Sequence, residues 1–385
     1  MPETLQRIPI AKPLLDEREV EAVRRVILSG WVTQGPEVEA FERDFARQVG
    51  ASHACAVSNC TTALHLALLA VGVGAGDDVI TVSHSFIATA NAVKYCGATP
   101  VFIDIEPDTY NLDPALIEAA ITPKTKAILC VHQLGMPCDL AGIVEIGRRR
   151  GVPVIEDAAC AIGSEILWNG RWEKIGKPHG DIACFSFHPR KVITTGDGGM
   201  LTTANAEFDR KFRLWRQHGM SVPDTVRHGS AEVVFESYPE IGFNYRMTDL
   251  QAAVGREQLK RLPEIVSGRR ALAADYGTLL VGIPGLRIPR EPAWARSNWQ
   301  SYCVGLPDGC DQRHVMQRML DHGISTRRGI MCTHREPAYA DGHGDALPVS
   351  EQCQDTNVIL PLYTGLTKAD LARVCDELAR SVGPR

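Results

Sequence analysis

The 385 residues include 41 Lys and Arg and 46 Asp and Glu, a net charge of −5, with 44% hydrophobic and 23% charged residues. This balance is typical of a globular protein and excludes a disordered, collagenous or membrane-spanning chain. It offers no basic stripe for nucleic acid and no polybasic patch for a membrane surface. The N-terminus, MPETLQRIPIAKP, lacks the apolar core of a signal peptide.

The 12 cysteines form no CxxC pair, and the sequence contains no HExxH motif. Cysteines in a long chain without a signal peptide are typical of reduced thiols that act as small hydrophobic residues. We therefore expect a cytoplasmic protein with no metal site.

The chain opens with two predicted amphipathic helices. Val20, Val23 and Ile27 share one face of the helix predicted over 16–30. Apolar residues recur at the same spacing over 36–50, which predicts the second helix.

From about residue 54, short apolar runs rich in β-branched residues alternate with helical stretches. The predicted strands are 54–57, 78–83, 100–105, 126–131, 153–157, 182–187 and 199–203. Strands that alternate with helices form a mostly parallel sheet with both faces covered. The predicted fold class is therefore α/β, with a large domain built on a seven-stranded sheet sandwiched by helices.

The alternation of predicted strands and helices ends after residue 204. A helix is predicted over 205–218, an irregular loop over 219–240, and two helices over 248–262 and 264–280. The C-terminal part contains a predicted strand (300–306) and two helices (312–323 and 368–380). We expect a large domain over residues 1–250 and a smaller α+β domain over 251–385. The glycines of VGVGAGDD do not match the dinucleotide fingerprint GxGxxG.

Four groups of residues with chemical potential follow predicted strands, where parallel sheets gather their ligands. Small and hydroxyl residues of SNCTT precede a helix and can bind an anion, Phe86 can stack on a planar ring, Asp157 can pair with a ring nitrogen, and Lys191 can react with an aldehyde. Each has a common structural alternative, such as a helix cap, core packing or a solvated loop. Together, they are the parts that pyridoxal phosphate requires.

Several segments resemble the DegT–StrS family of sugar aminotransferases: SNCTTALHLAL, FIATANAVKYCGATPVFIDI, PVIEDAACAIG, FSFHPRKVITTGDGGML and FNYRMTDLQAAVGREQL. The resemblance implies a fold-type-I pyridoxal phosphate enzyme, a homodimer with shared active sites, that aminates nucleotide-linked keto-sugars. It implies that Lys191 is the Schiff-base lysine and that Asp157 is the partner of the pyridine nitrogen. Phe86 would stack on the ring. The implied phosphate contacts are Cys60, Thr61, Ser186 and, from the neighbouring subunit, Asn244.

The sequence departs from the family at two places. Cys160 occupies a position where many members carry Gln or His, so a contact to the ring hydroxyl is lost or replaced. The stretch between Asp157 and Lys191 also looks longer than usual, with extra residues near 167–180. These extra residues either touch the substrate or cap the sheet edge, and we favour the second interpretation.

The leading hypothesis is an aminotransferase that moves an amino group from an amino acid, L-glutamate, to a 3- or 4-keto-6-deoxy nucleotide sugar. A related dehydratase is disfavoured, because those enzymes carry His in place of the lysine. Two alternatives stay open: amination of a cyclitol ketone, and a non-catalytic regulator on the same fold.

Overall fold

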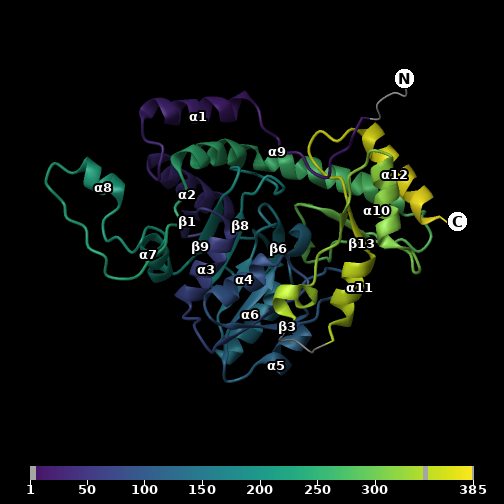
Figure 1. The fold of residues 1–385 in the computed structure, drawn as a ribbon, viewed down its shortest axis with the longest axis horizontal. Helices are drawn as coiled ribbons and strands as arrows, with labels where there is room; N and C mark the ends of the chain where they lie inside the picture. Colours follow the sequence, from purple (N-terminus) through teal and green to yellow (C-terminus); the bar gives the residue numbers. More distant parts are fainter. Residues whose placement is uncertain (1–5, 341–345, 384–385) are drawn as a thin grey trace.

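The computed structural model describes residues 6–340 and 346–383 (Figure 1). All seven strands predicted in the N-terminal half are present and belong to one sheet. They are β1 (His53–Val57), β2 (Asp78–Val82), β3 (Thr99–Ile103), β4 (Thr125–Val131), β5 (Val154–Asp157), β8 (Ile182–Ser186) and β9 (Gly199–Thr203). The order in the sheet is β1-β9-β8-β5-β4-β2-β3. Only β9 runs antiparallel to its neighbours, which confirms a mostly parallel sheet.

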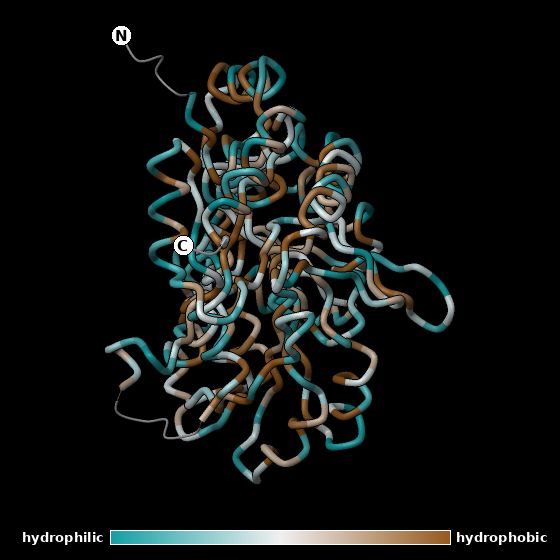
Figure 2. The backbone as a smooth tube through the Cα atoms, turned by 90° about the vertical axis from the view of Figure 1, so that its right-hand side faces the viewer, coloured by the Kyte–Doolittle hydropathy of each residue, from teal (hydrophilic) through white to brown (hydrophobic). Residues whose placement is uncertain are grey.

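Helices cover both faces of this sheet, as predicted. The helices around the sheet are α2 (Pro36–Val49), α3 (Cys60–Ala70), α4 (Ala88–Tyr95), α5 (Ile117–Ala120), α6 (Leu140–Arg150) and α7 (Ala206–Trp215). Alternate residues of each strand point to opposite faces, so Ile80 and Val79 belong to two different apolar clusters. One cluster includes α2 and α6, and the other includes α3, α4 and α7. Hydrophobic segments of the chain, brown in Figure 2, accordingly concentrate toward the interior of the fold.

The first helix, α1 (Glu17–Ser29), is present as predicted, and the apolar face that carries Val20 and Ile27 is not the face that it buries. Val20 and Ile27 are exposed, whereas Ala22 and Val26 are buried together with Glu19. Glu19 is buried because its carboxylate accepts hydrogen bonds from the Asp16 N–H and from Gln258 Nε2. A polar partner on the neighbouring helix thus selects a face that hydrophobicity alone does not indicate.

The two helices predicted on either side of Pro263 are one helix, α9 (Asp249–Leu280). Proline disfavours a helix interior because it lacks an N–H and crowds the preceding turn. Packing outweighs this penalty: α9 contacts α1 and α2 near its start and α12 (Lys368–Val382) near its end (Figure 1). The proposed division at residues 250 and 251 stays a prediction.

The loop predicted over 219–240 contains one short helix, α8 (Asp224–Gly229), and otherwise has no regular structure. It projects away from the body of the molecule (Figure 1). The extra residues near 167–180 form a hairpin of β6 (Glu165–Trp168) and β7 (Arg171–Lys174), which pairs with β10 (Ala295–Arg296).

The C-terminal part has the predicted α+β character. A second three-stranded sheet contains β11 (Tyr302–Gly305), β12 (Arg327–Arg328) and β13 (Asn357–Leu360). It packs with α10 (Gln312–Asp321) and α12, and α11 (Pro348–Thr356) leads into β13. No helix among residues 6–340 and 346–383 is long and apolar enough to cross a bilayer.

Candidate active site

A cavity of about 870 Å³ lies where the carboxyl ends of the parallel strands meet the C-terminal part of the chain. The residues that follow β1, β2, β4, β5 and β8 line one side, which we call the strand-end wall. The opposite side, the C-terminal wall, consists of residues 300–301 and 327–331 with Ile359, Leu360 and Leu362. The predicted residues Cys60, Thr61, Phe86, Asp157, Cys160, Ser186 and Lys191 all lie on the strand-end wall.

Asp157 is the last residue of β5 and is buried. Its Oδ2 accepts a hydrogen bond from Thr89 Oγ1 (2.8 Å), and its Oδ1 accepts one from the Ala159 N–H (3.1 Å). No helix begins there, since residues 158–164 form turns, so Asp157 is not a helix cap. Burial raises the pKa of this carboxyl group, although the two hydrogen bonds and Lys191 oppose the change.

A second buried pair lies beside Asp157. His132, also fully buried, contacts Glu156 through Nε2 (3.0 Å) and accepts the Cys138 N–H through Nδ1 (3.1 Å). Because Nδ1 accepts a hydrogen bond, Nε2 carries the ring proton and donates it to Glu156. Glu156 also accepts the Gly180 N–H (3.0 Å), so the residue before Asp157 is fixed on both sides of the strand end.

Lys191 lies in the loop after β8, and its Nζ donates to the sulfur of Cys160 at 3.0 Å. Two opposing effects act on the charge of this amine. Burial does act against the charge, but Cys160, Asp157 and Cys60 outweigh it, so that the pKa of Lys191 is raised. Lys191 must therefore give up a proton before its amine can act as a nucleophile.

The segment between β1 and α3 forms a cup of backbone N–H groups. Asn59 is the N-cap of α3: its side chain accepts the Thr62 N–H (2.9 Å). The N–H groups of Cys60 and Thr61 donate to no atom of the described residues. This helix start is therefore compatible with both interpretations, helix capping and anion binding. Asn59 caps the Thr62 N–H, and the N–H groups of Cys60 and Thr61, two residues that line the cavity, stay available for an anion.

The remaining predicted residues differ in their exposure. Ser186, at the end of β8, is buried, and its Oγ accepts the His188 N–H at 3.4 Å. Phe86 is 65% exposed and lines the cavity, so it is not a core residue. Asn244 is exposed and does not line the cavity of its own chain, although the carbonyl group of the next residue, Tyr245, accepts the Ser58 N–H (2.8 Å).

The sequence analysis missed Thr89 and the whole C-terminal wall. Thr89 lies on α4, three residues after Phe86, and its spacing alone could have suggested that it faces the same site. Arg327 and Arg328 on β12 gave no local signal, because an exposed pair of arginines is common on any surface. Among the described residues, Arg190 and Arg327 form no ion pair, so the cavity holds unneutralised positive charge.

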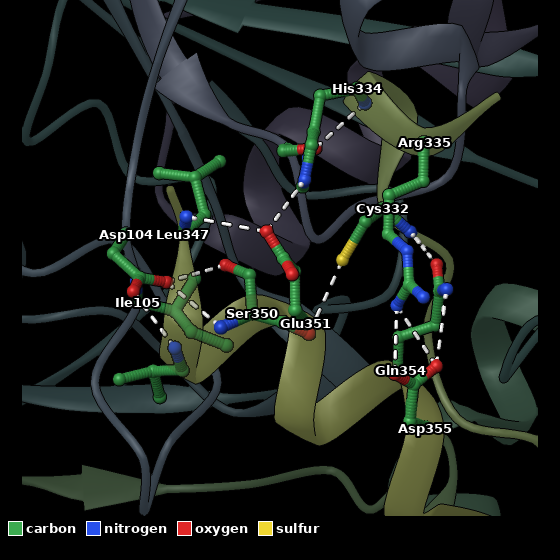
Figure 3. Close-up of polar contacts among 12 residues, drawn as sticks. Asp104, Ile105, Cys332, His334, Arg335, Leu347, Ser350, Glu351, Gln354 and Asp355 are labelled. Carbon is green, nitrogen blue, oxygen red and sulfur yellow. Dashed lines mark hydrogen bonds and ion pairs between the residues drawn. The ribbon is translucent and has the colours of Figure 1, made fainter. Parts of the chain in front are cut away.

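Polar contacts attach the chain around His334 and around Ser350, both after β12, to the large sheet (Figure 3). Asp104, just after β3, accepts the Val349 and Ser350 N–H groups (both 2.9 Å) and the Ser350 hydroxyl (2.6 Å). His334 contacts Ser83 Oγ through Nδ1 (2.6 Å) and Glu351 through Nε2 (3.2 Å). We call these contacts the Asp104–His334 clamp, because they fix both ends of the segment that follows β12.

The hairpin at 165–174 does not reach the cavity. None of its residues lines the cavity, and the Arg296 guanidinium lies 3.8 Å from the ring centroid of Trp172. The hairpin belongs to a separate three-stranded sheet with β10, so the interpretation that these residues cap the edge of the large sheet stays a prediction.

The residues of the strand-end wall fit pyridoxal phosphate. Two unsatisfied N–H groups at a helix start suit its phosphate group, the buried Asp157 carboxylate suits its ring nitrogen, and the Lys191 amine suits its aldehyde. No group of three or more potential metal ligands occurs in the described part of the chain.

Comparisons with known proteins agree with this chemistry. Residues 13–379 match the model of the DegT/DnrJ/EryC1/StrS aminotransferase family. The chain is 42% identical to GDP-perosamine synthase from Caulobacter vibrioides over 96% of this chain and 97% of that protein. It is similar to the crystal structure of the aminotransferase TlmJ from Streptoalloteichus hindustanus, with 35% identity, a TM-score of 0.89 and coverage of 97% and 98%.

A second similar structure, the sugar aminotransferase Spr1654 from Streptococcus pneumoniae in its PLP-form, is 25% identical, has a TM-score of 0.89, and the match covers 98% of this chain and 100% of that chain. Family, fold and cofactor chemistry thus agree. The chain belongs to the DegT/DnrJ/EryC1/StrS aminotransferase family and is a pyridoxal phosphate-dependent aminotransferase.

Proposed function

We propose that this aminotransferase moves an amino group from L-glutamate to the keto group of a nucleotide-linked 3- or 4-keto-6-deoxy sugar, as a step of amino-sugar biosynthesis. The observation that carries the proposal is the cavity in which Lys191, Asp157 and two unsatisfied N–H groups lie together. Its volume of about 870 Å³ is near the upper end of the ~300–1,000 Å³ of ordinary ligand pockets, which leaves room for a substrate beside the cofactor. The relative that makes GDP-perosamine supports a nucleotide sugar as the acceptor.

The bound cofactor supplies an aldehyde that carries the amino group and a ring that withdraws electrons from the reacting carbon. In our proposal, Asp157 keeps the ring nitrogen protonated, because a buried carboxylate favours the nearby positive charge. Cys60 and Thr61 hold the phosphate group through their N–H groups, with Ser186 beside them. Lys191 first holds the cofactor and then accepts and returns a proton at Nζ.

The charges of the cavity support an anionic substrate. Arg190 lies on the strand-end wall and Arg327 on the C-terminal wall, and neither is neutralised by a described carboxylate. A nucleotide diphosphate and the carboxylates of glutamate both match guanidinium groups. Since donor and acceptor enter the same site in turn, we propose that both use this positive charge.

The test is a screen in which the purified protein is incubated with L-glutamate and a panel of nucleotide-linked keto-sugars, and the products are identified by mass spectrometry. Amination of one of them, with release of 2-oxoglutarate, is the expected result. Amination of a cyclitol ketone, with none of the nucleotide sugars converted, would contradict the proposal.

We further propose a homodimer in which Asn244 completes the phosphate site of the neighbouring subunit. Asn244 is exposed and lies outside its own cavity. The loop before it carries the exposed apolar residues Val233, Phe235 and Ile241, between 84% and 90% exposed, which suits contact with a second chain. The free thiols of the described cysteines suit a cytoplasmic location.

Mixing two impaired variants, Lys191→Ala and Asn244→Ala, tests the shared site. In a mixed dimer, one site collects both changes and the other collects neither. Random association makes about half of the dimers mixed, so roughly a quarter of the native activity should return. If Asn244 served its own chain, activity would not exceed the sum of the two variants.

A further inference from the structure

The contact between Lys191 and Cys160 has no role in the proposal so far. Among the described residues, the sulfur of Cys160 is the only side-chain hydrogen-bond partner of Lys191 Nζ, at 3.0 Å. Both groups line the cavity. The sequence places Cys160 three residues after Asp157, at a position where the resemblance leads us to expect Gln or His.

The main chain at Cys160 is held from the C-terminal part of the protein. Asn298 is fully buried, and its Nδ2 donates to the carbonyl groups of Cys160 and Ile162, both at 2.8 Å. Its Oδ1 accepts the Gln300 N–H, also at 2.8 Å. Because the side-chain amide is used on both sides, the backbone that presents the thiol to Lys191 has a fixed position.

The titratable and charged groups that surround the Lys191 amine are Asp157 at the end of β5, Cys160 just after it, Cys60 at the start of α3, His188, Arg190 and Asp197 on its own loop, and His132 behind Asp157. Asp157 is already engaged by Thr89 and the Ala159 N–H. Burial raises the pKa of Cys60 well above its usual range, so that Cys60 stays a thiol. Cys160 is therefore the group that can share a proton with Lys191.

Ordinary thiols lose their proton before ordinary amines do, since their pKa values are about 8.5 and about 10.4. A thiol that contacts an amine can therefore share a proton with it, with the negative charge on sulfur. A hydroxyl or amide at the same position could accept the hydrogen bond but could not supply this negative charge.

We propose that the thiol of Cys160 is the positioning partner of Lys191: it holds the amine and its proton during the part of the reaction in which Lys191 is not joined to the cofactor. This proposal rests on the proposed role of Lys191. The shared proton moves between nitrogen and sulfur only, so the step needs no further reactant.

The first experiment measures how fast the full-length protein, freed of its cofactor, takes up pyridoxal phosphate between pH 6 and pH 10. We expect the pH midpoint of uptake to be about one unit lower in Cys160→Ala, because only Asp157 and Cys60 then oppose the effect of burial on the amine, and uptake below the midpoint to be about tenfold faster. Cys160→Ser keeps an acceptor without the charge, so its midpoint should lie between the two. Cys310→Ala, a change at a half-buried cysteine near α12, is the matched control and should behave as the wild type.

If Cys160→Ala does not fold, Cys160→Ser decides, since its midpoint must still lie below that of the wild type. Identical midpoints in the folded variants and the wild type would overturn the proposal. A merely structural role would lower thermal stability without moving the midpoint.

The second experiment does not depend on the cofactor. Iodoacetamide alkylation of Cys160, followed by peptide mass spectrometry, should be about tenfold slower at pH 7 in Lys191→Met, because the charged amine no longer favours the thiolate. Cys310 should react at the same rate in both proteins. Equal rates at Cys160 would overturn the pairing. By contrast, a pyridoxyl group that borohydride fixes on another lysine would contradict the proposed function. The alkylation result would still decide whether Cys160 and Lys191 form a pair.

Discussion

The two walls of the cavity are built in different ways. The strand-end wall consists of residues that directly follow β1, β2, β4, β5 and β8, so the parallel sheet itself brings them to one edge. The C-terminal wall comes from short segments around β12 and β13 and depends on the Asp104–His334 clamp for its position (Figure 3). We propose that the strand-end wall provides the chemistry and that the C-terminal wall selects the substrate.

The largest expected effect is at Lys191. Lys191→Ala should lose at least ~10³-fold in turnover, because it removes both the covalent attachment and the proton transfer. Borohydride treatment of the wild type should fix a pyridoxyl group on Lys191 alone, as detected by mass spectrometry of peptides. Lys94→Ala, a change at an exposed lysine of α4, is the control and should retain native turnover.

The next effect is at Asp157, also on the strand-end wall. Asp157→Asn should keep the fold and the attached cofactor but lower turnover by about 10²–10⁴-fold, the size of an impaired proton-transfer step, because the ring nitrogen loses the carboxylate that keeps it protonated. Turnover near the native rate would show that Asp157 does not act on the cofactor ring.

The same variant has a pH signature. Burial raises the pKa of Asp157 in the folded chain, so the protonated carboxyl group stabilises the fold relative to the ionised one. This stabilisation is fully present below the ordinary pKa of about 3.9 and is lost as the pH rises through the pKa of the folded chain. Without cofactor, Asp157→Asn should therefore melt ~1–2 °C above the wild type at pH 7. The difference in melting temperature should disappear toward pH 4. A variant that melts below the wild type at pH 7 would contradict the expected direction.

A change in the clamp should act through the C-terminal wall. Asp104→Asn replaces an oxygen that accepts from Ser350 or Val349 and should cost about 1–3 kcal/mol in the free energy of unfolding, measured with urea. It should raise the KM for the sugar more than it lowers kcat, with an unchanged cofactor spectrum. Asp108→Asn, an exposed neighbour, serves as the control. An effect on kcat alone would break the distinction between the two walls.

The smallest effect is expected at the exposed end of the clamp. The side chain of Glu351 is 40% exposed where it meets His334. Glu351→Gln keeps an acceptor and should change the free energy of unfolding by no more than ~0.5 kcal/mol, because solvent screens the pair. A loss as large as that of Asp104→Asn would show that the contact between Glu351 and His334, and not the buried carboxylate of Asp104, holds this part of the chain.

Sequence patterns predicted the strand-end wall because each of its groups follows an apolar run within a few residues. Asp157 ends such a run and Lys191 follows another, so both could be placed at one sheet edge. The C-terminal wall could not be predicted in this way, since Arg327 lies on a two-residue strand that pairs with β13, and the chain after it is held by contacts of His334 with Ser83 and of Ser350 with Asp104. Those partners are more than 200 residues away in the sequence.

The errors in the predicted helices have the same origin. Val20 and Ile27 gave α1 an apolar face, but the hydrogen bond from Gln258 to Glu19 turns another face inward. Pro263 indicated a break, but the contacts of α9 with helices from both ends of the chain keep it continuous. Local patterns predict that an element exists, whereas its orientation and its limits depend on distant partners.

The continuity of α9 restricts how this enzyme can be recombined with its relatives. A chimaera joined at residues 250 and 251 would place the junction in the first turn of a 32-residue helix whose capping box is made by Thr248 and Gln251. The segment after Leu280 is a safer junction, because residues 281–294 contain no helix or strand. A transplant that begins there would carry β11, β12 and β13, and with them Arg327, into another member of the family while the recipient keeps its own α9.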